Sequence, residues 1–254
     1  MATERADRYW RETFGVSDAE FGAPGILVRA NSGRVSGRSA AWVFVCGDSC
    51  LVSVPPDLLG FVREAAQDLP PEAVLSPEVL HALFRGRITR TVGPSYQGYA
   101  ERLDFRPLPC EQIRLLSGAD RPALERLRGA CDPAEWEDSG VSLDSEPLFG
   151  YVNQGSVLAV AGVILWSPYA ANPAVLTHPG SRGQGCGTAV ASAAMAHILD
   201  QGSVVLYQTL LQNRAAVRIA ASLGCQEYAR MMYAGLGSDE GQPRAQRDAE
   251  GRAR

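Results

Sequence analysis

The stretch THPGSRGQGCGTAVASAAMAH, residues 177–197, decides the fold of this chain. Glycine occupies every second position from 183 to 187, directly before a segment of small residues. Glycine lets main-chain N–H groups approach a ligand closely, and the first turn of a helix carries unpaired N–H donors and a partial positive charge. The pattern therefore predicts a strand–loop–helix unit that binds a phosphate or pyrophosphate, with Arg182 adding a positive charge.

Two common phosphate-binding patterns are absent from the loop. The Walker pattern needs a lysine, but all 24 basic residues of the chain are arginine. The dinucleotide pattern G-x-G-x-x-G fails because the sixth position, counted from Gly183, is Thr188. The sequence therefore favours neither a nucleoside triphosphate nor a nicotinamide dinucleotide as the ligand.

The second half of the chain, about 110–236, resembles the GCN5-related N-acetyltransferase (GNAT) superfamily. The acyl-CoA loop of that family reads [QR]-x-x-G-x-[GA], and Arg182, Gly185 and Gly187 match it. The family's next landmark is an Asn after the following strand, which is Asn213 here, and then a short helix that ends here in ASLGC, 221–225. The resemblance implies an α/β (α+β) fold, in which a mixed sheet is flanked by helices.

The same resemblance implies a site for acetyl-CoA, or another acyl-CoA, as co-substrate. The backbone at the end of the strand 173–177 would pair with the pantetheine arm, the N–H groups of the loop would hold the pyrophosphate, and the strand 203–210 would splay away to form the acyl slot. The residues implied in binding the cofactor are Leu176, Thr177, Arg182, Gly183, Gln184, Gly185, Cys186, Gly187, Thr188 and Asn213.

The catalytic residues are less well defined by the sequence. Many family members use a Tyr seven residues after the Asn to reprotonate the thiolate, but that position is Ala220 here. Tyr207 or Tyr228 could protonate the thiolate instead, as could water, or the reaction could proceed without a general acid. His178 is the candidate general base, because its unperturbed pKa suits proton transfer near neutral pH; a packing role is the alternative.

The acceptor is expected to be a primary amine of a small molecule. The segment 132–151 is rich in acids, which would attract a cationic amine; an ordinary solvated loop is the alternative. The candidate substrate-binding residues are Glu135, Trp136, Glu146 and Tyr151.

The sequence therefore predicts an N-acyltransferase in which the amine attacks the thioester directly. One alternative keeps the fold and takes the acyl group from a carrier protein or an aminoacyl-tRNA. Another is a non-catalytic acyl-CoA sensor, which the missing Tyr at Ala220 makes worth testing.

Apolar runs and breakers divide the chain into two domains and a tail. A Pro-rich break, 106–110, places a boundary near residue 108. Residues 1–108 are predicted to form a smaller α+β domain, which could be a degenerate copy of the acyltransferase fold, a lid or a module for homodimerisation. Residues 109–236 would form the catalytic domain, and 237–254 a disordered tail.

Composition narrows the class of protein and its partners. The chain has 254 residues, 46% of them hydrophobic, and a formal net charge of -4, so a basic footprint for nucleic acid is absent. The spacing of six Cys and three His gives no metal-ligand motif, which predicts no bound metal. No signal peptide or membrane span is visible, and free thiols favour the cytoplasm.

Overall fold

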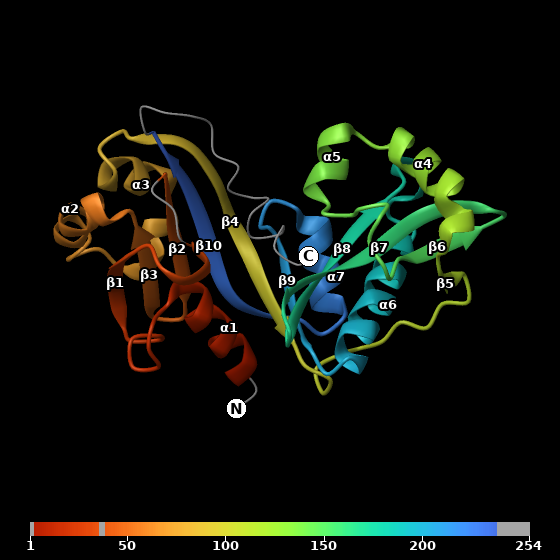
Figure 1. The fold of residues 1–254 in the computed structure, drawn as a ribbon, viewed down its shortest axis with the longest axis horizontal. Helices are drawn as coiled ribbons and strands as arrows, with labels where there is room; N and C mark the ends of the chain where they lie inside the picture. The colour runs from red at the N-terminus through yellow and green to blue at the C-terminus, as the bar shows by residue number, and fades with distance from the viewer. Residues whose placement is uncertain (1–2, 36–38, 238–254) are drawn as a thin grey trace. The chain divides into compact units, whose positions relative to one another are not determined.

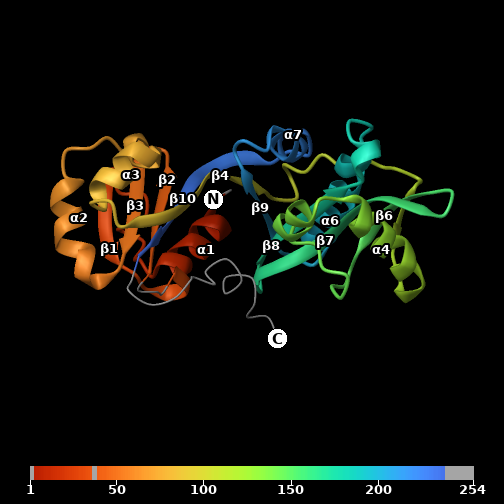
Figure 2. The same ribbon diagram turned by 90° about the horizontal axis from the view of Figure 1, so that it is seen from above.

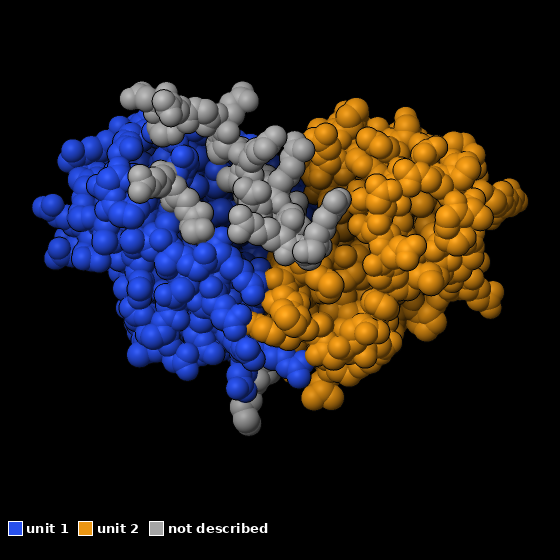
Figure 3. Space-filling model, viewed as in Figure 1, with its two compact units in different colours: residues 1–97, 208–214, 227–254 blue, residues 98–207, 215–226 orange. Residues whose placement is uncertain are grey.

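The computed structural model describes residues 3–35 and 39–237, and the chain divides into two compact units (Figure 3). The first comprises residues 1–97, 208–214 and 227–254, and the second comprises 98–207 and 215–226. Residues 238–254 of the predicted disordered tail lie outside the described part of the chain.

Five strands and three α-helices make up most of the first unit (Figure 1). The strands follow the order β1-β3-β2-β10-β4, in which β1 is parallel to β3, and both β3 and β10 are antiparallel to β2. The elements are α1 (Glu4–Phe14), β1 (Gly25–Ala30), β2 (Ala40–Cys46), β3 (Ser49–Val54), α2 (Leu59–Ala65), α3 (Pro77–Leu83), β4 (Ile88–Ala100) and β10 (Gln226–Leu236).

Alternation along β2 builds two apolar layers in this unit. Val43 and Val45 join the core that α2 and α3 cover, whereas Phe44 faces α1, where its ring lies 4.6 Å from that of Trp10. Because successive strand residues point to opposite faces, one strand can serve both layers. Figure 2 shows α2 and α3 on one side of these strands and α1 on the other.

The second unit has strands in the order β9-β8-β7-β6-β5. The strands β5 to β8 are antiparallel neighbours, and β8 runs parallel to β9. Its elements are β5 (Ile113–Leu115), α4 (Arg121–Ala130), α5 (Pro133–Asp138), β6 (Phe149–Asn153), β7 (Ser156–Ser167), β8 (Ala170–Thr177), α6 (Cys186–Asp200), β9 (Val204–Leu210) and α7 (Arg214–Ser222).

Helices cover both faces of the strands β6 to β8. On one face α4 and α5 pack through Leu127 and Trp136 against Val160 and Leu176. On the other face the small side chains of α6, including Val190, pack against the Ala-rich centre of β7. The predicted class, a mixed sheet flanked by helices, is thus confirmed.

Several predicted elements have different bounds in the structure. The run RITRTVG, residues 87–93, predicts a strand. In the structure this strand is β4, which continues past Pro94 to Ala100, because buried residues follow the proline. The strand predicted over 173–177 begins earlier, at Ala170. The short strand β5 has no counterpart among the predictions. Asp120 is the N-cap of α4, although its side chain makes no capping bond to that helix. It instead completes a capping box with Ser117, the N-cap of the 3-10 turn Gly118–Asp120, by accepting from the Ser117 N–H.

The last strand of the chain pairs with the first unit. β10 is antiparallel to β2 from Arg230 opposite Val45 to Gly235 opposite Ala40. Residues 208–214 are also grouped with this unit, and the Leu211 N–H donates to the Pro94 carbonyl at 3.0 Å. The assignment of separate roles to the two sides of residue 108 stays a prediction.

Candidate functional site

The glycine-rich loop joins β8 to α6 through a short turn. The strand ends at Thr177, and the His178 side chain caps a 3-10 turn over Pro179–Ser181. Gly183 and Gly185 then adopt left-handed backbone conformations, with φ of 76° and 82°. Gly185 is the N-cap of α6. The predicted strand–loop–helix unit is therefore present.

The loop presents a continuous run of unpaired amides. Within the described residues, no backbone acceptor is recorded for the N–H groups of residues 183–188, although that of Cys186 is directed at its own thiol, and the first amide of α6 that bonds to a carbonyl is that of Ala189, which donates to the Gly185 carbonyl at 3.0 Å. Because unbonded donors at a helix N-terminus are a ready-made anion site, the loop can bind a phosphate.

The glycines of the loop have two different structural roles. A Cβ added at Gly183 or Gly185 would meet no heavy atom within 4 Å, so both positions border open space. A Cβ at Gly187 would lie 2.7 Å from the Thr177 hydroxyl, so that glycine permits α6 to approach β8 closely. Ligand access and close packing are therefore both properties of this motif.

Arg182 lies at the start of the glycine-rich loop, and its guanidinium forms an ion pair with Glu135. Its Nη2 donates to the Glu135 carboxylate at 2.8 Å, and its Nε lies 3.5 Å from the Thr177 carbonyl. The arginine and glutamate side chains are 47% and 46% exposed, so solvent screens the pair. Gln184 holds the turn from the other side through a 3.1 Å hydrogen bond to the Gly180 carbonyl.

The strands β8 and β9 separate soon after they meet. Their register comprises only two pairs, Ala170 with Val204 and Ala171 with Val205. On its other side β8 stays paired with β7 as far as Thr177, which lies opposite Ala159. The edge of β8 between the end of this register and the loop is thus left without a partner on β9.

His178 is half-buried, and one side of its ring is engaged. Its Nδ1 accepts a hydrogen bond from the Gly180 N–H at 3.1 Å. A nitrogen that accepts carries no proton, so the neutral imidazole has its proton on Nε2. In this state His178 can donate from Nε2, and it could accept a proton only after the Gly180 bond is broken.

The other candidate acids lie in different surroundings. Tyr207, on β9, is only 3% exposed. The Tyr228 hydroxyl donates a hydrogen bond to the Asp7 carboxylate. Burial, together with that hydrogen bond, holds the pKa of Tyr228 far above its ordinary value of 10.0. Ala220 is fully buried on α7, and Asn213 is exposed in the turn before that helix.

The predicted acceptor residues are distributed over both faces of the sheet. Trp136 is 8% exposed in the core beneath α4 and α5, and the Arg128 guanidinium lies 5.5 Å from its ring centroid. Tyr151 packs on the opposite face, beside Cys186, and burial raises its pKa. Glu146 is exposed in the loop before β6. The structure does not bring these side chains together.

Structural contacts account for three of the acidic side chains in this segment. Asp132 caps α5 by accepting from the Ala134 N–H at 2.8 Å. Asp144 pairs with Arg121 at 2.8 Å, and Glu135 pairs with the loop arginine. The segment is therefore less negative toward an acceptor than its composition suggests.

Cys186 begins α6 but is not an activated thiol. Its side chain is 2% exposed, and burial raises the pKa of the thiol. A raised pKa disfavours the nucleophilic thiolate. Within the described residues, no group of three or more His, Cys, Asp and Glu side chains could hold a metal ion. No described helix is long and apolar enough to cross a membrane.

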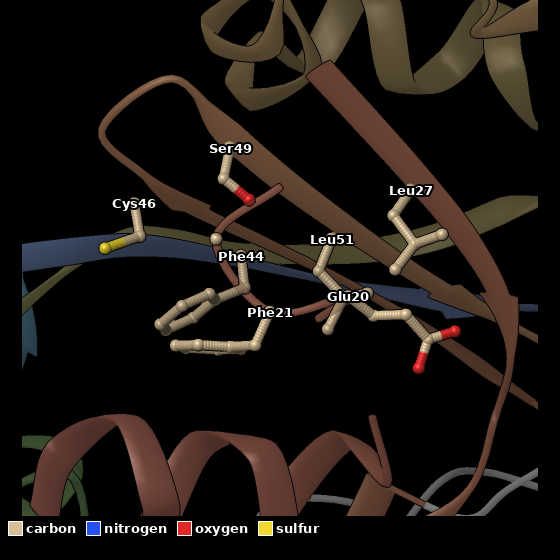
Figure 4. A pocket seen from close by; sticks show the side chains of 8 residues that line it. Glu20, Phe21, Leu27, Phe44, Cys46, Ser49 and Leu51 are labelled. Atoms are coloured by element: carbon tan, nitrogen blue, oxygen red, sulfur yellow. The ribbon is translucent and has the colours of Figure 1, made fainter. Parts of the chain in front are cut away.

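A small pocket lies in the first unit (Figure 4), and the ring of Phe44 in its lining lies 6.3 Å from that of Tyr228. About 260 Å³ of space, part of it open to solvent, lies between β1–β3 and the turn that contains Glu20 and Phe21. The rings of Phe21 and Phe44, 6.1 Å apart, form one wall. The Glu20 carboxylate is already bonded to Ser17 and Arg29, so the pocket offers a ligand mainly apolar contact.

Residues 149–234 match the family model described as FR47-like protein. The resemblance to the GNAT superfamily is confirmed over this region. No curated protein matches the chain. A GNAT-family acetyltransferase from Colwellia psychrerythraea is 18% identical, and the match covers 92% of this chain and 96% of that one with a TM-score of 0.52, which shows a shared fold.

Two further solved structures are similar at lower scores. A GCN5-related N-acetyltransferase-like protein from Streptococcus suis is 15% identical, with a TM-score of 0.48, over 92% of this chain and all of that one (100%). The protein yncA from Salmonella typhimurium, solved with its cofactor acetyl-CoA, is 19% identical, with a TM-score of 0.39, over 52% of this chain and 97% of that one.

Proposed function

We propose that the protein is an N-acyltransferase that transfers an acetyl group from acetyl-CoA to a primary amine of a small molecule. The observation that carries this proposal is the run of amides from Gly183 to Thr188, at the start of α6, for which no backbone acceptor is recorded in the described residues. The donors fit a pyrophosphate, and the open space at Gly183 and Gly185 leaves room for it. The match of residues 149–234 to the FR47-like family supports an acyl-CoA as the ligand.

In this proposal the backbone of β8 receives the pantetheine arm along its unpaired edge. The thioester supplies the activated acyl group, and the amine attacks it directly. The backbone of Leu176 and Thr177 would contact the end of the pantetheine arm nearest the loop, and the Arg182 guanidinium would add a positive charge beside the pyrophosphate. Asn213 would contact the cofactor near the thiol, as the family resemblance implies.

Proton transfer in this reaction would rest on few side chains. With its proton on Nε2, the neutral His178 ring can donate a hydrogen bond, for instance to the departing thiolate. Its predicted role as general base would require the Gly180 bond to open during turnover. Tyr207 is the second candidate donor. In the simplest form of this mechanism, solvent removes the proton from the attacking amine.

Two measurements test the proposal. Calorimetric titration with acetyl-CoA should show saturable binding at one site per chain. A panel of small amines, incubated with the protein and acetyl-CoA, should then release free CoA, which a thiol reagent detects. Absence of acetyl-CoA binding would remove the acetyl-CoA proposal and leave a carrier-protein or aminoacyl-tRNA donor to be tested.

A non-catalytic acyl-CoA sensor is the second candidate. Ala220 is fully buried at the position where the family often has a Tyr, so the usual proton donor is absent. Binding of acetyl-CoA without release of CoA from any amine would favour the sensor over the enzyme. We further propose a cytoplasmic location, since all six cysteines are free.

A further inference from the structure

The position of Pro173 in β8 suggests why the sheet opens where it does. Toward β7, the His178 N–H donates to the Leu158 carbonyl at 2.8 Å. Because backbone groups alternate between the two edges of a strand, the even-numbered residues of β8 bond to β7, and the odd-numbered residues face β9. Pro173, opposite Val163, therefore costs the β7 ladder no hydrogen bond although it has no N–H.

On the β9 side the same proline falls at the next rung of the ladder. The Val204 N–H donates to the Tyr169 carbonyl at 2.9 Å, and the register continues as far as Ala171 opposite Val205. In a parallel ladder the following bond would run from the N–H of residue 173 to the Leu206 carbonyl. Proline cannot make that bond, and the recorded register ends at this rung.

We propose that Pro173 is a positioning residue that stops β8 from pairing with β9 beyond Ala171. The N–H groups of Val175 and Thr177 then stay available on the open edge for the pantetheine arm. This inference rests on the proposed function for its ligand, but the placement of the open edge is a property of the chain alone. Packing of the surrounding side chains is the competing cause of the separation, and the experiment decides between them.

The test replaces Pro173 by Ala in the full chain and compares Pro168→Ala as the matched control. Pro168 is exposed in the turn between β7 and β8, outside both strands. In P173A the new amide at residue 173 should be protected from hydrogen exchange, because it bonds to the Leu206 carbonyl. The affinity for CoA should fall about tenfold, since the ligand must displace one or two backbone hydrogen bonds.

The results separate this inference from the proposed function. Rapid exchange of the residue 173 amide, together with unchanged CoA affinity in P173A, would overturn the positioning role and assign the separation to packing. Loss of affinity in both proline variants would also overturn it. If the wild-type chain binds no CoA, the proposed function fails, whereas amide protection in P173A still supports the strand-opening role. Pro173→Val serves as a second variant, because Val is favoured in strands and also restores the donor.

Discussion

Substituting Gly185 by Val should separate backbone strain from loss of ligand binding. Gly185 has φ of 82° and ψ of -7°, in the left-handed region, where an L-residue costs roughly 1–2 kcal/mol. Its added Cβ would clash with no protein atom within 4 Å, so the larger side chain projects into the space before the first turn of α6. We therefore expect a folded but moderately destabilised protein.

The expected loss of affinity follows from the donors that the side chain would cover. A hydrogen bond to a charged group contributes about 1.5–3 kcal/mol, so losing two amide–phosphate bonds costs roughly 3–6 kcal/mol. This corresponds to a weakening of CoA binding by at least about a hundredfold. Calorimetric titration with CoA measures it, beside thermal unfolding of the same samples.

Gly202→Val is the matched control for this substitution. Gly202 has φ of 77°, its Cβ would also meet no atom within 4 Å, and it follows the C-terminal end of α6. Both variants should lose similar stability, and only Gly185→Val should lose CoA affinity. Wild-type affinity in Gly185→Val, at equal destabilisation, would refute the placement of the pyrophosphate. Gly185→Ala should give an intermediate result if the steric reasoning is right.

Two further predictions concern ion pairs of the second unit. Glu135→Gln should raise CoA affinity about two- to threefold at low salt, because the substitution removes the negative charge paired with Arg182, and the gain should vanish at high salt. Calorimetric titration with CoA measures this, with Glu137→Gln on the same helix as the control. An equal gain of affinity in both variants would contradict the prediction. Asp120→Asn should lower the thermal midpoint at neutral pH, because a hydrogen bond from Arg114 depresses the pKa of the folded Asp120 carboxyl below its ordinary 3.8. This stabilisation is fully present above the unfolded pKa and is lost as pH falls toward and through the folded pKa, so the difference in thermal midpoint should shrink progressively below about pH 4. A difference that does not shrink as the pH is lowered would exclude the mechanism.

Local features of the site could be predicted from the sequence because their signals are local. Left-handed glycines before a helix, a strand that ends at Thr177 and a missing Tyr at Ala220 all depend on neighbouring residues. The pairing of β10 with β2 joins residues about 190 positions apart, and no local pattern encodes it. β5 has only three residues, Ile113–Leu115, and so short a run is not enough to distinguish a strand from a loop by its pattern.

The acceptor side was harder to predict because residue type does not determine environment. An aromatic or acidic side chain in a loop suits a binding site and an ordinary fold equally well. Trp136 is in the core, and Glu135 is paired with an arginine 47 positions away, a contact that exists only once α5 is placed. Such long-range contacts depend on tertiary packing, which the composition of a single segment does not reveal.

The loop also shows how one motif can satisfy two physical requirements at once. Gly187 is needed because a side chain there would collide with Thr177, and this requirement would exist in a protein without any ligand. Gly183 and Gly185 face open space, so packing alone does not demand them; their left-handed backbone turns the chain so that the amides of the first turn stay unbonded. Substitutions at Gly187 should therefore act mainly on stability, whereas those at Gly185 should act on stability and on binding together. A difference between these two responses would identify the loop as a binding element rather than a connection.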